Sequence, residues 1–219
     1  MPAAAIVAAA GAGERAGAGD TPKQFRPLAD KPLLCWSVEI LCAVCDEVVV
    51  VAPRAHLDFA RSLCGEDVAV VAGGPTRQAS VANGLSEVGA DRVVIHDAAR
   101  PFLTKEIVVA VLAGLDNADA AIAAVPATDT LKQVDRARVQ RTVERSSLWA
   151  AQTPQAFSTD ALRRAHEKAA LEKLDFTDDA ALIEHAGGSV AVVEGDVRNI
   201  KITTAADFRL AEAIAASVL

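Results

Sequence analysis

Aromatic side chains are the scarcest chemical class in this chain. Phe, Trp and Tyr together make up 4% of its 219 residues, and there is no tyrosine. Proteins that hold single-stranded nucleic acid stack its bases on aromatic rings, so this composition argues against that function. Positive charge is not in excess either, since the formal net charge is −7. We therefore expect no nucleic-acid partner, and any site for an anion must be a local cluster of cations.

Long apolar segments and repeated cysteine pairs are also lacking. No run of about 20 apolar residues occurs, which is the length that a membrane helix needs. The first fifteen residues resemble a signal peptide in their small side chains, but they lack a basic start and suit a buried strand better. The only CxxC is Cys42 and Cys45, whereas a zinc site needs a second pair. We expect a cytoplasmic protein with reduced thiols and no membrane partner.

Apolar residues, 52% of the chain, recur in short runs that alternate with helical patterns. Runs such as VVVVA are continuous, which is typical of strands buried on both faces of a parallel sheet. The alternation predicts a single α/β domain over residues 1–219, with helices on both faces of a mostly parallel sheet. The expected strands are 4–10, 47–52, 67–72, 92–96, 119–125 and 189–194. The expected helices are 32–44, 54–64, 77–88, 104–115, 158–173, 178–187 and 204–217.

One segment, residues 128–147, breaks this pattern. It reads TDTLKQVDRARVQRTVERSS, with two β-prone stretches around a turn near residues 135–138. We predict a β-hairpin arm that projects from the sheet. An isolated hairpin is marginally stable in water, so a second subunit is its simplest packing partner. A solvated, helix-like excursion is the alternative.

A glycine-bearing loop follows the first apolar segment, in AIVAAAGAGER at residues 5–15. Gly11 and Gly13 allow backbone N–H groups to approach an anion, and Arg15 and Lys23 add positive charge. The Walker A pattern is absent. The glycines fit a dinucleotide fingerprint, but no second strand ending in an acidic residue follows. A tight structural turn is the alternative; the two cations favour a triphosphate site.

Two further motifs follow predicted strands. In HDAARP, Asp97 lies at the carboxyl end of the strand 92–96, where open parallel sheets bind ligands. A carboxylate beside a triphosphate is favourable when Mg²⁺ lies between them, because Mg²⁺ binds one or two carboxylates together with phosphate oxygens. Arg100 can reach an anion at the same place. The alternatives are a helix cap for Asp97 and, for Arg100, an ion pair with Asp97 or Asp91.

In GGPTRQAS, Gly73 and Gly74 permit close approach to a flat ligand, while Arg77 and Ser80 lie near a helix start, where anions bind. Lys201, in RNIK, could enter the site or be solvated, and its sequence alone favours solvation.

The four histidines show no metal-ligand spacing, and His56, His166 and His185 are expected on helix surfaces. A Ser–His–Asp site is excluded, because the GxSxG elbow is missing.

These motifs together resemble a known family. AAGAGER with PKQF, GGPTRQAS, HDAARP, TPQAF and RNIK have the order and spacing of 2-C-methyl-D-erythritol 4-phosphate cytidylyltransferases of isoprenoid precursor synthesis. The resemblance covers about residues 4–215, and the pairing of HDAARP with RNIK is its specific part. It implies a Rossmann-like fold, transfer of CMP from CTP to methylerythritol phosphate with release of pyrophosphate, Mg²⁺ as cofactor, and a homodimer with interlocked arms.

The resemblance also implies roles for individual residues. Arg15 and Lys23 correspond to the catalytic cations around the α-phosphate, and Asp97 to the magnesium ligand. The residues implied at the nucleotide are Ala9, Ala10, Gly11, Ala12, Gly13, Gly74, Arg77, Ser80, Asp97 and Ala98. Those implied at the acceptor are Arg100, Thr130, Arg145, Thr153, Thr177 and Lys201, with Thr130 and Arg145 reaching it from the partner's arm.

Two other functions stay open at this point. A cytidylyltransferase acting on ribitol 5-phosphate would share the nucleotide site. A nucleotide-binding module without turnover would bind CTP yet release no pyrophosphate. The chain also departs from many relatives in having Ala16 after the loop arginine and a longer, glycine-rich segment at residues 16–21.

Overall fold

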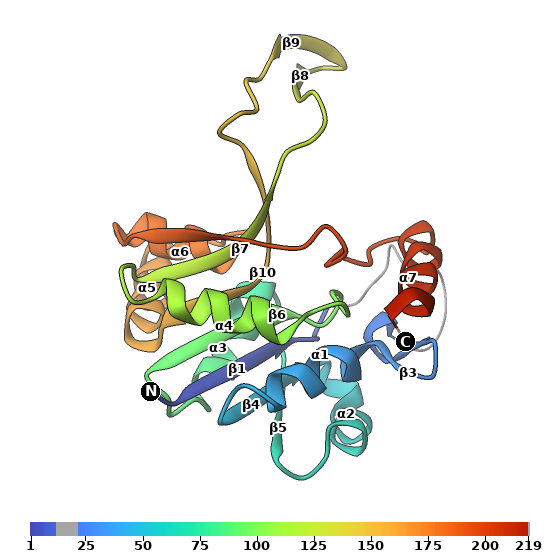
Figure 1. The fold of residues 1–219 in the computed structure, drawn as a ribbon. Helices are drawn as coiled ribbons and strands as arrows, with labels where there is room; N and C mark the ends of the chain where they lie inside the picture. Colours follow the sequence, from blue (N-terminus) through green and yellow to red (C-terminus); the bar gives the residue numbers. More distant parts are fainter. Residues whose placement is uncertain (12–21, 219) are drawn as a thin grey trace.

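The central feature of the fold is a seven-stranded sheet in the order β11-β7-β10-β6-β1-β4-β5 (Figure 1). The structure, a computed structural model, describes residues 1–11 and 22–218. Only β10 runs antiparallel to its neighbours β6 and β7. The predicted mostly parallel α/β sheet is thus confirmed. Its strands are β1 (Ala3–Ala8), β4 (Glu47–Ala52), β5 (Val68–Ala72), β6 (Arg92–Asp97), β7 (Ala120–Pro126), β10 (Trp149–Ser158) and β11 (Val190–Glu194).

Helices cover both faces of the sheet. Along β1, Ala5 and Val7 pack in a cluster with α1, α2 and α4, whereas Ala4 and Ile6 pack in a second cluster with α3, α5 and α6. The continuous apolar runs of the sequence are explained by this burial on two sides. The helices are α1 (Leu33–Cys42), α2 (Leu57–Cys64), α3 (Arg77–Leu85), α4 (Lys105–Gly114), α5 (Thr159–Glu172), α6 (Asp179–Ala186) and α7 (Ala205–Val218).

Smaller elements complete the chain. A second, small sheet pairs β2 (Pro27–Leu28) with β3 (Lys31–Pro32), and short 3₁₀ turns cover Lys23–Phe25 and Arg54–His56. Helix α7 packs there, where Phe208 and Ala211 join a third apolar cluster. None of the helices within residues 1–11 and 22–218 is both long and apolar enough to cross a bilayer.

Strand β10 was not among the strands expected from the sequence. Its residues WAAQTPQAFS contain no continuous apolar run, yet Gln152, Thr153 and Gln155 are all buried. The strand lies in the middle of the sheet, between β6 and β7, where its polar side chains find hydrogen-bond partners from other elements. A second expectation was also wrong: His166 is buried in α5 rather than on its surface.

The predicted arm is present as a β-hairpin. β8 (Lys132–Asp135) pairs with β9 (Arg138–Thr142) through a two-residue turn, in which Arg136 and Ala137 both have positive φ angles. Every residue from 128 to 142 is exposed, and the hairpin stands clear of the sheet (Figure 1). Exposed apolar side chains occur on it, with Val134 55% and Val139 61% accessible. The helix-like alternative for this segment is therefore excluded.

Candidate active site

A pocket of about 360 Å³ opens where β1, β5 and β6 end. Its volume falls in the range of small-molecule sites, and its place, at the carboxyl ends of parallel strands, is where α/β sheets bind ligands. The structure brings together here most of the residues expected at the nucleotide. Those lining the pocket are Ala9, Ala10, Gly11, Lys23, Gly74, Arg77, Ser80, Asp97, Ala98 and Lys201. Ala12, Gly13 and Arg15 lie outside the described residues.

The glycine loop is held open by a side chain that the sequence did not single out. Gln24 is buried, and its Nε2 donates to the carbonyl oxygen of Ala9 at 2.5 Å and to that of Gly11 at 3.4 Å. A Cβ added at Gly11 would meet no described atom within 4 Å. The backbone at Ala9 and Gly11 is thus held by Gln24, and the missing side chain of Gly11 leaves space beside it. Gln24 belongs to the PKQF motif, and that motif was the signal for it.

Gly73 and Gly74 both lie against other parts of the protein. A Cβ at Gly73 would lie 2.2 Å from the Cβ of Ala10, and one at Gly74 would lie 2.6 Å from the Cβ of Ala79. Gly73 therefore allows the loop after β5 to pack against Ala10, and Gly74 allows the same loop to pack against the first turn of α3.

Both oxygens of the Asp97 carboxylate contact cations. Oδ1 lies 3.1 Å from Nε of Arg77, and Oδ2 lies 2.7 Å from Nζ of Lys201. Burial alone would raise the pKa of Asp97, but the charges of Arg77 and Lys201 outweigh it and hold the pKa well below its usual range. The carboxylate is thus ionised. Of the two alternatives for Lys201, the structure has the one in which its ammonium reaches the site, although 42% of the side chain stays accessible.

Arg100 makes no ion pair with Asp97 in this structure. Its guanidinium donates instead to the carbonyl oxygen of Asn199 at 2.7 Å and to that of Ala151 at 3.5 Å. The side chain is mostly buried, and it joins the end of β6 to the segment that carries RNIK. Arg100 therefore fixes the two motifs relative to each other.

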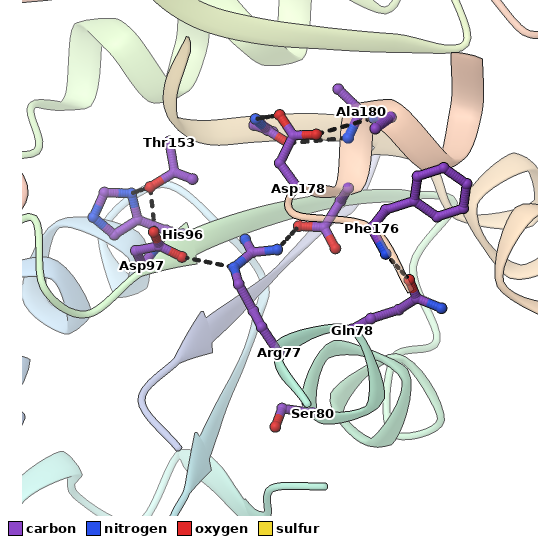
Figure 2. A network of polar contacts seen from close by, with 12 residues as sticks. Arg77, Gln78, Ser80, His96, Asp97, Thr153, Phe176, Asp178 and Ala180 are labelled. Carbon is purple, nitrogen blue, oxygen red and sulfur yellow. Dashed lines mark hydrogen bonds and ion pairs between the residues drawn. The ribbon is translucent and has the colours of Figure 1, made fainter. Parts of the chain in front are cut away.

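A chain of hydrogen bonds through Thr153 and His96 holds the backbone of Asp97 (Figure 2). The amide of Asp97 donates to Oγ1 of Thr153 at 3.0 Å, and that hydroxyl lies 3.2 Å from Nδ1 of His96. Nε2 of His96 lies 2.9 Å from the carbonyl oxygen of Arg100, which can only accept, so Nε2 carries the proton and Thr153 donates to Nδ1. Burial lowers the pKa of His96 to about 4. The imidazole is therefore neutral and structural.

The Arg77 guanidinium lies between two carboxylates. Besides its contact with Asp97, its Nη1 lies 2.8 Å from Oδ2 of Asp179 at the start of α6. Burial lowers the pKa of Arg77, but Asp179 and Asp97 raise it by more, so the guanidinium stays charged. Asp179 was not among the residues expected at the site.

Loop 173–178, between α5 and α6, is attached to the first turn of α3. Gln78 accepts a hydrogen bond from the amide of Phe176 at 2.9 Å (Figure 2). It also donates to the carbonyl oxygen of Leu174 at 3.2 Å. Thr76 donates to Asp175 at 3.0 Å. This loop carries Thr177, which is exposed. Three hydrogen bonds therefore join loop 173–178 to Thr76 and Gln78, on either side of the pocket residue Arg77.

Five residues expected at the acceptor do not line this pocket: Arg100, Thr130, Arg145, Thr153 and Thr177. Thr177 lies on the loop just described, and Thr130 and Arg145 lie on the exposed arm. Thr153 is buried, and its hydroxyl accepts a hydrogen bond from the backbone amide of Asp97. Only Lys201 of the acceptor set lines the pocket itself.

Comparison with known proteins identifies the family. A family model described as 2-C-methyl-D-erythritol 4-phosphate cytidylyltransferase matches residues 3–217. The chain belongs to this family. Cytidylyltransferases of this name from Geotalea uraniireducens (strain Rf4) and Aquifex aeolicus (strain VF5) are 43% and 44% identical to it. The alignment with the first covers 98% of this chain and 97% of the relative, and the alignment with the second covers 96% of both.

Solved structures agree with this assignment. The crystal structure of 2-C-methyl-D-erythritol 4-phosphate cytidylyltransferase from Thermus thermophilus is 35% identical and superposes with a TM-score of 0.86. The match covers 99% of this chain and 100% of that one. As a member of this cytidylyltransferase family the chain is an enzyme, and the pocket beside Asp97 is its candidate active site.

Proposed function

We propose that the chain transfers CMP from CTP to 2-C-methyl-D-erythritol 4-phosphate and releases pyrophosphate, as a step of isoprenoid precursor synthesis. The observation that carries this proposal is the pocket itself. It combines the glycine loop with three cations, Lys23, Arg77 and Lys201, around the single carboxylate of Asp97. A site with this charge pattern suits a polyanionic nucleotide better than a neutral ligand.

The reaction forms a bond between the acceptor's phosphate oxygen and the α-phosphorus, and it breaks the bond to pyrophosphate. The acceptor is a phosphate monoester with a second pKa near 6, so it is already largely anionic at neutral pH. No general base is then needed, which fits a site whose histidine, His96, is buried and neutral. The protein's task is to bring two anions together and to stabilise charge at phosphorus.

Lysines are well placed for that task. Lys23 lines the pocket, with its Nζ donating to the carbonyl oxygen of Ile202 at 2.5 Å, beside Lys201 in the chain. We assign to Lys23 and Arg15 the stabilisation of charge at the α-phosphate and on departing pyrophosphate. Ser80, Gly74 and Arg77 would hold the base side of the nucleotide, and Lys201 the phosphate side.

The residues present fit a magnesium ion that arrives with the nucleotide. Among the described residues, no group of three Asp, Glu, His or Cys side chains could hold a metal ion by itself. One carboxylate completed by phosphate oxygens and water is the coordination that Mg²⁺ favours. Asp97 would be its protein ligand, and the ion would neutralise charge on the triphosphate.

The arm suggests a homodimer. Its exposed apolar residues Val134 and Val139 are best covered by a second copy of the chain, because a hairpin alone is marginally stable. Thr130 and Arg145 would then reach the acceptor in the partner's pocket, and Arg100, Thr153 and Thr177 would complete that site within each chain. The protein would work in the cytoplasm.

Pyrophosphate release tests the proposal. CTP and Mg²⁺ are supplied with methylerythritol 4-phosphate, with ribitol 5-phosphate or with no acceptor. We expect release only with methylerythritol 4-phosphate. Release only with ribitol 5-phosphate would keep the mechanism and change the acceptor. CTP binding without release in any mixture would instead identify a non-catalytic nucleotide-binding module.

A further inference from the structure

Asp179 is a buried carboxylate to which the proposed reaction gives no role. Its side chain is only 1% accessible, at the first turn of α6. Oδ2 forms an ion pair with Nη1 of Arg77 at 2.8 Å, and neither oxygen makes a further hydrogen bond to any described residue. Burying a carboxylate costs several kcal/mol unless it is well paired. A site that keeps such a group therefore gains something from it besides stability.

Arg77 is the charged partner that Asp179 and Asp97 share. Its guanidinium lies 2.8 Å from Asp179 and 3.1 Å from Asp97. Lys201 occupies the other oxygen of Asp97 at 2.7 Å. In this arrangement a divalent cation that approaches either oxygen of Asp97 meets a positive group beside it. Arg77 and Lys201 therefore compete with a metal ion for this carboxylate.

Arg77 can leave Asp97 without becoming an unpaired buried charge, because Asp179 remains to neutralise it. Lys201 is the more exposed of the two cations, with 42% of its side chain accessible against 26% for Arg77. It can turn towards phosphate or solvent, whereas Arg77 cannot reach solvent as easily. Asp179 thus allows a metal ion to replace the buried Arg77 guanidinium at Asp97.

We propose that Asp179 is a positioning residue that holds the Arg77 guanidinium and thereby makes Asp97 available to the divalent cation accompanying CTP. The inference rests on the proposed magnesium site at Asp97. Asp179 itself touches neither nucleotide nor metal; it acts through Arg77. Without it, Arg77 has Asp97 as its only carboxylate and competes with the metal there.

Calorimetric CTP binding tests this without turnover. The readout is the magnesium enhancement, the ratio of the CTP dissociation constant in EDTA to that in Mg²⁺, measured with no acceptor. This ratio cancels any loss of direct nucleotide contacts within each variant. Asp179→Asn should lower the enhancement about tenfold, a coupling typical of residues in one ion-pair network. Glu184→Gln, which removes the same charge from an exposed position of α6, should leave it unchanged.

A double-mutant cycle separates positioning from simple charge. Arg77→Met removes the competitor, so its enhancement should equal or exceed that of the wild type. Arg77→Met/Asp179→Asn should then match Arg77→Met, because Asp179 has nothing left to position. A further drop in the double variant would show that Asp179 acts only through its charge, which overturns the proposal. If Asp179→Asn alone fails to fold, Arg77→Met/Asp179→Asn and Arg77→Met still test the proposal, because the double variant leaves no unpaired buried charge at this ion pair.

The wild-type value distinguishes failure of this inference from failure of the proposed function. Enhancement in the wild type that is unchanged by Asp179→Asn refutes the positioning role and leaves the magnesium site intact. No enhancement in the wild type refutes the magnesium site at Asp97, and the inference with it. Pyrophosphate release is measured separately and depends on neither result.

Discussion

Lys23 is the single described side chain on which we place most of the chemistry. It is half-buried, lines the pocket and belongs to a 3₁₀ turn whose neighbour Gln24 fixes the glycine loop. Removing one preorganised donor from a developing charge typically costs about 10²–10³ in rate. Lys23→Ala should therefore lower turnover by at least that factor with little change in the unfolding transition.

Steady-state pyrophosphate release checks this prediction. Lys105→Ala provides the control, since it removes an exposed lysine at the start of α4. Equal turnover in Lys23→Ala and the wild type would contradict the role assigned to Lys23.

His166 gives a prediction about acid stability. Its ring is buried, its Nε2 has no hydrogen-bond partner among the described residues, and burial, aided by the charge of Arg77, lowers its pKa to about 4. The unfolded chain, with a histidine pKa near 6.5, binds more protons between these values. The contribution of His166 to the free energy of unfolding is thus fully present above about pH 6.5 and is lost as the pH falls towards 4.

His166→Leu should remove this part of the pH dependence. Between pH 7 and pH 5 the wild type should lose about 1–2 kcal/mol of unfolding free energy through His166, and the variant should keep it. Urea unfolding at both pH values measures the difference. His96 contributes in the same direction and is left in place. An identical loss in the variant and the wild type would rule out His166 as a source.

The residues at strand ends could be predicted from the sequence, and their partners could not. Asp97 and the glycine loop follow apolar runs, so their place at the sheet edge follows from topology. Asp179 depends on a contact that local sequence does not encode, because its partner Arg77 lies about a hundred residues away. The place of Lys201 stayed open for the same reason, since its partner Asp97 comes from a distant strand.

At the scale of elements, β10 shows where hydrophobic patterning fails. Apolar runs predict buried strands, but β10 borders a polar site and buries Gln152, Thr153 and Gln155 instead. Their amides and hydroxyl are satisfied by distant partners, as in the bonds from Asn199 to Thr153 and from Ala180 to Gln155. The other six strands of the large sheet carry apolar runs and were all predicted.

The attachment of loop 173–178 to α3 also leads to a prediction. Gln78 makes two hydrogen bonds to backbone groups of that loop, each worth about 1 kcal/mol. Gln78→Ala should release Thr177 from its position and raise the KM for the acceptor about tenfold, with a smaller effect on the KM for CTP. Ser86→Ala, which removes a hydrogen bond at the other end of α3, is the matched control. Equal changes in the KM values for CTP and for the acceptor would show that Gln78 stabilises α3 and does not position Thr177.

The whole molecule divides into a nucleotide pocket and an arm. Every residue lining the pocket comes from outside residues 128–147. The arm begins and ends at paired positions, because Pro126 of β7 lies opposite Trp149 of β10. A short Gly–Ser turn can therefore replace residues 128–147 without separating the two strands. The nucleotide pocket and the arm can thus be tested independently.

Such an arm-deleted variant should fold, bind CTP as the wild type does, and sediment as a monomer. It should have lost turnover, because Thr130 and Arg145 would no longer reach a partner's acceptor site. Sedimentation, calorimetric CTP binding and pyrophosphate release check the three parts in turn. If the variant remained dimeric, the dimer interface would have to lie outside the arm. A monomer with normal turnover would instead leave each pocket complete within one chain, and the arm would then serve only assembly.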